Sequence, residues 1–177
     1  GYTVGSATTS LGGRDNTLVG YKAGYNLEFG ARNTMMGYKA GMIASDNGAG
    51  NASENHIVLG FQAMGSVDTA ILEGDANVAI GNSTMGYLSG SSENNISIIG
   101  GLGTQSAGVV GSYNIAIGSE TLTAVVGSSA SQGNIALGKQ TMNALTTGNY
   151  NVAIGRFALG SLNQATTNLE NNAALGY

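Results

Sequence analysis

Cysteine is absent from this sequence, and charged residues are scarce. Without cysteine the chain has neither a disulfide framework nor a thiolate metal site, so thiols say nothing about its redox compartment. Charged residues make up 9% of the chain, against roughly 25% in typical soluble domains. The surface is therefore expected to be polar but mostly neutral.

Basic residues and long apolar runs are also lacking. The chain has six Lys and Arg residues and a net charge of −4, and no basic residue lies between Lys39 and Lys139. Its middle therefore offers no basic surface to phosphate groups, and we expect no nucleic acid partner. No apolar run reaches the roughly 20 residues of a membrane-spanning helix. The N-terminus also lacks the pattern of a signal peptide. We expect no membrane insertion and a soluble internal fragment.

The residues that are abundant repeat in order. Hydrophobic residues form 42% of the 177 positions, which is enough for a buried interior. A five-residue unit, Asn-Val/Ile-Ala-Ile/Leu-Gly, recurs with clear copies starting at Asn77, Asn114, Asn134, Asn151 and Asn172. Diverged copies start at Asn16, Asn33 and His56, and the copy at Asn95 has an extra residue. The closing glycines stand at positions 20, 37, 60, 81, 100, 118, 138, 155 and 176. This regular self-similarity indicates a repeat architecture.

Each repeat predicts one short strand. Large aliphatic residues occupy most of the second and fourth places, and alanine occupies the middle place in five copies. Alternation with period two puts the large and small residues on opposite faces, and the alanine face permits close approach by another coil or another chain. Strands stacked at roughly 4.8 Å would satisfy their backbone groups. The predicted fold is β-rich, a stacked-rung β-solenoid or β-roll-like coil.

The segments around each strand predict bends and corners. Clusters of Gly and Asn precede most strands, and both residues tolerate left-handed backbone geometry. In seven of nine copies the third residue after the glycine is Ala or Thr, followed by Gly, Met or Leu, which suits a tight corner. Three stretches that lack glycine until near their ends are expected to form short helical turns, namely residues 119–126, 139–145 and 156–162.

The strand-initial asparagines are predicted to stack as a structural amide ladder. A ligand-binding role for this ladder is the alternative. The residues concerned are Asn16, Asn33, Asn77, Asn114, Asn134, Asn151 and Asn172. Residues 1–15 are assigned to a partial or diverged N-terminal repeat, and residues 16–177 to a nine-copy shaft. Because the chain stops at Gly176-Tyr177, where a further repeat would continue, we expect a longer protein that is truncated or cleaved.

These units resemble the repeats of phage tail fibres and of fibrous bacterial surface adhesins, and their core is similar to the SVAIG motif of trimeric autotransporter adhesin heads. The resemblance covers residues 16–177. It implies a parallel homotrimeric fibre that is extracellular, on a virion tail or a bacterial surface. The repeats would form a shaft in host or prey cell attachment, presenting a distal tip that binds a cell-surface glycan or another receptor. The copies here are longer and less even than those of the adhesin heads.

The best candidates for ligand contact are the aromatic residues that follow the glycine in three copies, Tyr21, Tyr38 and Phe61. In register these rings would form a stripe. An exposed stripe would suit a glycan, because sugar rings pack against aromatic faces beside polar side chains. The favoured interpretation is instead an internal ladder that packs the corners. The alternative function is therefore a glycan-binding module on the repeat surface; ice binding would need regular Thr rows, which the uneven loops disfavour.

Apparent catalytic motifs have structural explanations. Residues 133–139 imitate a phosphate-binding loop, but Gln140 stands where Ser or Thr is required. His56 is the single histidine and replaces a strand-initial asparagine, so a structural role is favoured over a general base. Asp68, Glu73 and Asp75 lie close together, yet their spacing matches no calcium loop. We expect no enzyme, no catalytic residue, no cofactor and no metal.

Overall fold

The computed structural model describes residues 14–25, 27, 30–42, 54–65, 74–86, 92–99, 111–124, 131–160 and 169–177. Nearly all of its regular structure is a set of three-residue strands. The strands are β1 (Thr17–Val19), β2 (Thr34–Met36), β3 (Ile57–Leu59), β4 (Val78–Ile80), β5 (Ile96–Ile98), β6 (Ile115–Ile117), β7 (Ile135–Leu137), β8 (Gly148–Asn149), β9 (Val152–Ile154), β10 (Leu169–Glu170) and β11 (Ala173–Leu175).

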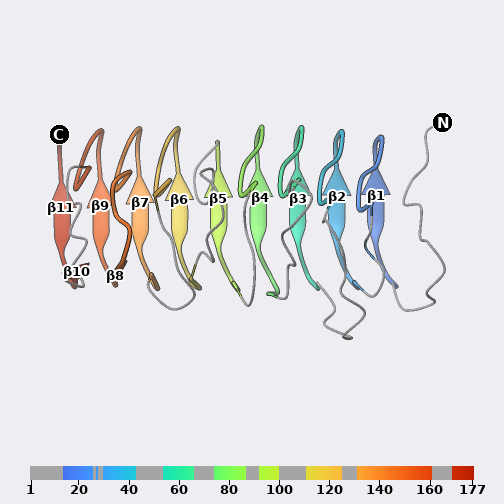
Figure 1. Cartoon of the computed structure of the whole chain (residues 1–177), viewed down its shortest axis with the longest axis horizontal. Helices are drawn as coiled ribbons and strands as arrows, with labels where there is room; N and C mark the ends of the chain where they lie inside the picture. The colour runs from blue at the N-terminus through green and yellow to red at the C-terminus, as the bar shows by residue number, and fades with distance from the viewer. Residues whose placement is uncertain are drawn as a thin grey trace.

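Nine of these strands form one parallel sheet in the order β1-β2-β3-β4-β5-β6-β7-β9-β11 (Figure 1). Equivalent residues of successive repeats pair in register; Val78, for example, pairs with Ile96. The short strands β8 and β10 pair with each other in a second parallel sheet. We call one strand of the large sheet, with the bend before it and the corner after it, a rung. The predicted stacked-rung β-solenoid is confirmed.

The middle residue of each three-residue strand faces the interior of the coil; it is Leu18, Met35 or Val58 in the first three rungs and Ala or Ser in the other six. Ala79, Ala116, Ala136 and Ala153 are fully buried, while the residues on either side of them are partly exposed. The interior is completed by long side chains from the corners, such as Met85, Leu122 and Met142, which pack in the same buried cluster. Since these side chains fill the space beside the sheet, the strand itself can contribute only a small residue in most rungs.

The glycine that closes each strand is required by close contact between rungs. Gly37 has φ 139° and Gly155 has φ 123°, values that residues with a side chain rarely adopt. A Cβ atom at Gly37 would clash with the backbone carbonyl of Gly60, and one at Gly155 with that of Gly176. This column of glycines therefore lets successive rungs approach at the end of the strand.

The fifth rung differs from the sequence-based prediction. The residue that closes its strand, in the place that glycine takes in the other rungs, is Ile99. Gly100 lies outside the described residues. The N–H of Ile99 donates to the carbonyl of Ile80 at 2.9 Å, as the N–H of Gly118 donates to that of Ile98 at 3.0 Å. Because β5 pairs in register with both neighbours, Ile99 must take the glycine's place, and it does so with φ 69°.

The predicted left-handed bend before each strand is confirmed in all nine rungs. The residue before each ladder position has φ between 55° and 65°. Only some of these residues are Asn or Gly; Arg32, Ala76 and Tyr113 adopt the same conformation. The bend is therefore imposed by rung stacking and not by residue type alone.

The predicted short helical turns are wrong for the residues that the structure describes. In 139–145, Gln140 and Met142 have φ 57° and 49°, so the chain alternates left-handed residues instead of winding into a helix. Their N–H groups donate to neighbouring rungs, to Ser119 O at 2.9 Å and Ala158 O at 3.1 Å. A glycine-free stretch suits a helix locally, but here the adjacent rung supplies the hydrogen-bond partners.

The corners pack as tightly as expected from their small residues. Ala23, Ala40 and Ala63 are fully buried, as are the threonines in the same column. The hydroxyl groups of Thr121 and Thr141 donate to the carbonyls of Gly138 and Gly155, each at 2.7 Å. Threonine at this place thus ties the corner of one rung to the glycine of the next.

Most of the predicted N-terminal repeat, residues 1–13, lies outside the described residues. Within the part of the chain that the structure covers, no helix is long and apolar enough to cross a membrane.

Candidate functional site

The largest candidate surface is the outer side of the nine-stranded sheet. We call it the outer face, defined by the first and third residues of its nine strands. Its first column is Thr17, Thr34, Ile57, Val78, Ile96, Ile115, Ile135, Val152 and Ala173, and its second column is Val19, Met36, Leu59, Ile80, Ile98, Ile117, Leu137, Ile154 and Leu175. Fifteen of these 18 residues are Val, Ile, Leu or Met, and none is charged.

The outer face is apolar along the whole sheet and is not covered by the described residues. Val19, Met36 and Ile57 are 43–48% exposed, although each is a large aliphatic side chain. Nine strands at about 4.8 Å spacing make the face about 38 Å long. A continuous apolar patch of this extent marks an interaction surface in soluble proteins.

The strand-initial asparagines form a continuous amide ladder inside the coil. In each step the backbone N–H of one ladder residue donates to the side chain of the preceding one at 2.8–3.1 Å, from Asn33 on Asn16 to Asn172 on Asn151. From Asn95 onward the Nδ2 group donates to the preceding Oδ1 as well, at 2.8–3.2 Å. Each step therefore uses the side-chain acceptor of the preceding ladder residue within the coil, as a structural ladder requires.

A second set of ladder bonds explains residues that the sequence analysis missed. Asn77 Nδ2 donates to Ser92 O at 2.8 Å, and Asn114 Nδ2 to Ser131 O at 2.9 Å, three residues before the next ladder position. Gly or Ser stands at that place in eight of nine copies. A Cβ atom at Gly74 or Gly111 would clash with the following rung. The small residue that recurs at this place was the feature of the sequence from which these hydrogen bonds could have been predicted.

His56 occupies the asparagine place in the third rung. Its Nδ1 accepts the backbone N–H of Asn77 at 3.1 Å, so this nitrogen carries no proton. Its Nε2 is buried and makes no hydrogen bond of ordinary geometry, although a backbone group of Gly74 interacts with the ring and raises its pKa slightly against the effect of burial. Burial lowers the pKa of His56 from 6.5 to about 4. A neutral, enclosed imidazole that accepts a backbone N–H is a structural replacement for asparagine and cannot reach a substrate.

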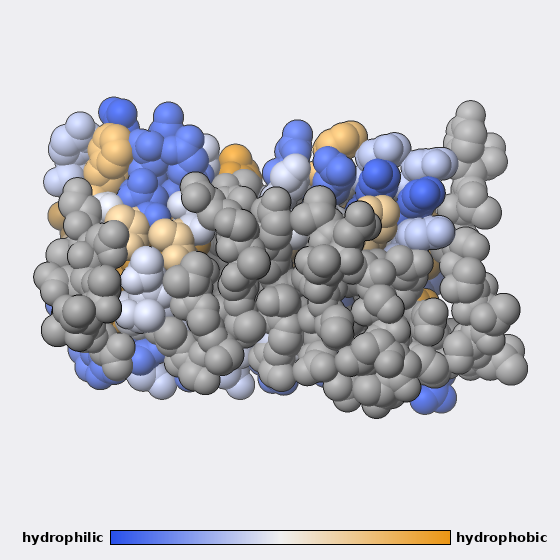
Figure 2. Space-filling view, viewed as in Figure 1, coloured by the Kyte–Doolittle hydropathy of each residue, from blue (hydrophilic) through white to orange (hydrophobic). Residues whose placement is uncertain are grey.

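The structure brings Tyr21, Tyr38 and Phe61 together as one stack, which we call the aromatic ladder. The ring centroids are 5.4 Å and 5.1 Å apart, with interplanar angles of 14° and 11°. The three side chains are 41–49% exposed, and Figure 2 shows the corners above β1, β2 and β3 uncovered along the upper edge of the molecule. The favoured interpretation of an internal ladder is therefore wrong.

Backbone hydrogen bonds fix the aromatic ladder. Lys39 N–H donates to Tyr21 O at 2.8 Å, Gln62 N–H to Tyr38 O at 2.9 Å, and Ser83 N–H to Phe61 O at 2.9 Å. Each aromatic residue is thereby held by the next rung. With the backbone held by these bonds and the rings stacked on one another, a ligand would meet a partly preorganised surface, which lowers the entropic cost of binding.

The remaining sequence candidates are not brought together as sites. Asp75 Oδ1 accepts the backbone N–H of Glu54 at 2.9 Å, and Asp68 and Glu73 lie outside the described residues. No group of three or more metal-binding side chains occurs in the described ranges. Residues 133–139 contain β7 and the glycine corner that follows it, so they form a rung like the others.

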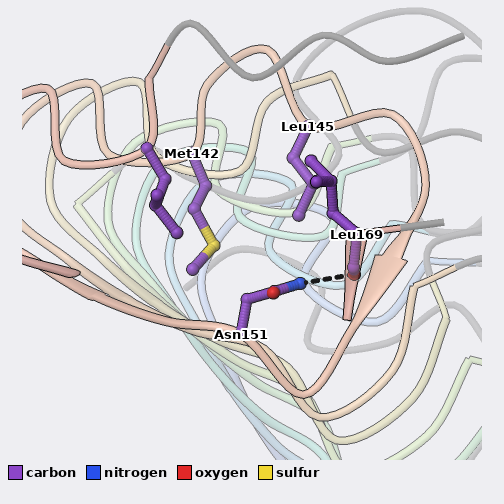
Figure 3. A pocket seen from close by; sticks show the side chains of 5 residues that line it. Met142, Leu145, Asn151 and Leu169 are labelled. Atoms are coloured by element: carbon purple, nitrogen blue, oxygen red, sulfur yellow. Dashed lines mark hydrogen bonds between the residues drawn. The ribbon is translucent and has the colours of Figure 1, made fainter. Parts of the chain in front are cut away.

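One enclosed space lies inside the coil near β9 (Figure 3). Met142, Leu145, Leu159 and Leu169 line it together with Asn151, whose Nδ2 donates to Leu169 O at 2.9 Å. The space has no room for a water molecule. It is a packing gap of the core and not a ligand pocket.

Two surfaces therefore remain as candidates, the outer face and the aromatic ladder. The first offers apolar side chains on a flat sheet, and the second offers aromatic rings at the corners of three rungs. No protein-family model, no curated protein and no solved structure matches the chain.

Proposed function

We propose that this chain is the shaft of an extracellular homotrimeric fibre that serves host or prey cell attachment and presents a distal receptor-binding tip. The observation that carries the proposal is the outer face, which remains apolar and uncharged although the coil's own interior is already filled. A single coil leaves 15 large aliphatic side chains in contact with water. Association with identical copies covers them without any new sequence element.

Parallel, in-register association fits the outer face best. The two columns carry similar aliphatic residues in every rung from β3 to β9, so aligned copies meet like surfaces along their whole length. Burying apolar area contributes about 25 cal/mol per Å². A face of uniform composition therefore gains most when the full length of the sheets overlaps, and a rod is the expected shape.

The test is the mass and shape of the purified chain in solution, measured by light scattering coupled to small-angle X-ray scattering. We expect a rod-shaped trimer. Ile117→Lys, which places a charge at the centre of the outer face, should yield the monomer. Ser119→Lys adds the same charge two residues later at an exposed corner and should remain trimeric. A compact wild-type monomer at micromolar concentration would refute the shaft.

Glycan binding by the aromatic ladder is a second candidate function, favoured by the exposure and fixed geometry of its rings. Binding to a glycan array, with Tyr38→Ala as the loss-of-function variant, tests it. Equal binding by this variant would exclude the ladder. Ice binding has less support, because the outer face carries threonine only at Thr17 and Thr34 among the described strands.

A further inference from the structure

The stacking of the aromatic ladder determines which part of each ring meets solvent. Tyr21 stacks on Tyr38, and Tyr38 on Phe61, with nearly parallel planes. The faces of the middle ring are therefore covered by its neighbours. What the ladder presents outward is a row of ring edges and the two tyrosine hydroxyl groups. Ring edges carry partial positive charge, and phenol hydroxyls donate hydrogen bonds.

Two lysines run beside this row. Lys22 and Lys39 follow the tyrosines directly and have φ 53° and 54°. Lys22 Nζ lies 5.7 Å from the Tyr21 ring centre and 4.7 Å from that of Tyr25, and Lys39 Nζ lies 5.4 Å from the Tyr38 ring centre. The same Tyr-Lys pair thus recurs in successive rungs.

Among the corner residues that the structure describes, no acidic side chain balances these lysines. The described corner residues 20–25, 37–42 and 60–65 contain no Asp or Glu. The acids of these rungs that the structure describes, Asp15 and Glu54, stand before the strands, at the opposite end of each rung. Glu54 forms an ion pair there with Arg32. The ammonium groups of Lys22 and Lys39 therefore lack an anionic partner among the described corner residues.

We propose that the corners of β1, β2 and β3 bind a linear acidic polysaccharide lying along the stacking direction. Its carboxylate or sulfate groups contact the ammonium groups of Lys22 and Lys39, while its hydroxyls exchange hydrogen bonds with Tyr21 and Tyr38. The Tyr-Lys pairs repeat at about 4.8 Å, so a chain with regularly spaced charges can engage both. The inference rests on the glycan-binding function proposed above and names its ligand class.

The same geometry disfavours two other ligand types. A neutral sugar packs best on an open aromatic face, and the stack leaves the middle ring no such face. Single-stranded nucleic acid binds through bases stacked on exposed rings, which meets the same obstacle. Recognition by edges, hydroxyls and ammonium groups selects for anionic groups on a hydroxyl-rich chain.

The test measures binding of the full chain to polygalacturonate, dextran sulfate, neutral dextran and single-stranded DNA by biolayer interferometry. Lys22→Ala/Lys39→Ala is the loss variant. Lys139→Ala/Arg156→Ala is the matched control, since it removes the same net charge from corners at the other end of the sheet. We expect the loss variant to bind the acidic polymers at least tenfold more weakly, and the control to stay within twofold of wild type. Gln62→Lys, which continues the lysine row into the third rung, should strengthen binding.

The outcomes separate the ligand class from the functions on which it rests. Equal weakening by both double variants would mean general charge attraction and would overturn the inference, as would a preference for single-stranded DNA. Binding to neutral dextran that ignores the lysines would leave glycan binding intact but refute an acidic ligand. Preference for polygalacturonate or for dextran sulfate identifies the anionic group. Light scattering on the same samples reports the trimer independently.

Discussion

His56 is the one ladder residue that is not asparagine. Its Nδ1 takes over the acceptor role of an asparagine Oδ1. Its Nε2 makes no hydrogen bond of ordinary geometry, although the backbone of Gly74, at the place where Ser92 accepts Asn77 Nδ2 in the next rung, interacts with the ring. The third rung is therefore expected to be a weaker step than the rungs with asparagine.

The first prediction concerns the pH dependence that His56 imposes on stability. The pKa is about 4 in the folded chain and 6.5 otherwise, so the unfolded chain binds the proton first as the pH falls. The stability contribution is complete above pH 6.5 and is lost as the pH drops toward 4, by about 3 kcal/mol in total. His56→Asn should abolish this part of the pH dependence. Urea unfolding of both proteins between pH 7 and 4 measures the difference, and parallel curves would contradict it.

The second prediction is that Ile99→Gly stabilises the chain. Ile99 is β-branched, has φ 69° and is 62% exposed, so its backbone is strained and its side chain is little buried. Glycine removes the strain but increases the freedom of the unfolded chain, and the expected net gain is about 1 kcal/mol. Thermal unfolding measures it. Ile98→Gly is the control and should destabilise, because Ile98 lies within β5 with a normal strand conformation.

Ile99 also shows what the sequence can and cannot predict about single residues. The recurrence of glycine at the end of each unit located eight of the nine anchoring positions correctly. In the fifth unit Ile99 and Gly100 are adjacent, and residue type favoured the glycine. Which of these two residues closes the strand is determined by the register of β5 against β4 and β6, which depends on the neighbouring rungs.

At the scale of elements, the glycine column and the amide ladder hold the rungs together from the two ends of each strand. The third prediction tests the glycine column. Gly37→Ala should destabilise the chain by at least about 2 kcal/mol, because it combines an unfavourable φ with a clash against the Gly60 carbonyl. Gly86→Ala is the matched control. A Cβ there meets Ser83 O at an ordinary 3.5 Å, so its unfolding free energy should change by less than about 1 kcal/mol.

The fourth prediction tests the amide ladder. Asn114 is fully buried, and its Nδ2 donates to Asn95 Oδ1 at 3.2 Å and to Ser131 O at 2.9 Å. Asn114→Asp replaces these donors by an acceptor facing two acceptors, and should cost about 3–5 kcal/mol at pH 7. Asn82→Asp makes the same change at an exposed corner and should be nearly neutral. Denaturant unfolding compares them; similar losses would argue against the ladder.

The elements differ in how far local sequence specifies them. The strands follow from alternation and from the recurring glycine, and the structure confirms them. The corners do not, because Lys139 to Leu145 suits a helix in isolation and becomes a left-handed turn only through hydrogen bonds to adjacent rungs. The exposure of the aromatic ladder could not be predicted from the sequence either, since the rings stack in register whether they face inward or outward.

At the scale of the whole molecule, the coil inverts the usual arrangement of large and small residues. Alanine faces the interior, and Ile, Val and Leu face outward. The sequence left both faces open as contact surfaces, because both are apolar. What decides between them is the long side chains of the corners, including Met142 and Leu122, which occupy the interior and leave room only for a small strand residue in those rungs. In the first two rungs the corner has Gly24 or Gly41 instead, and the larger Leu18 or Met35 of the strand fills the space.

The fifth prediction follows from this inversion. If the outer face is buried between copies, folding and association are linked, and the melting temperature rises with protein concentration by mass action. Wild-type protein should melt at higher temperature across a hundredfold increase in concentration, whereas Ile117→Lys should melt at a constant temperature. Light scattering at the same concentrations assigns the species. A constant melting temperature for the wild type, with a monomer at every concentration, would mean that the outer face serves a different partner.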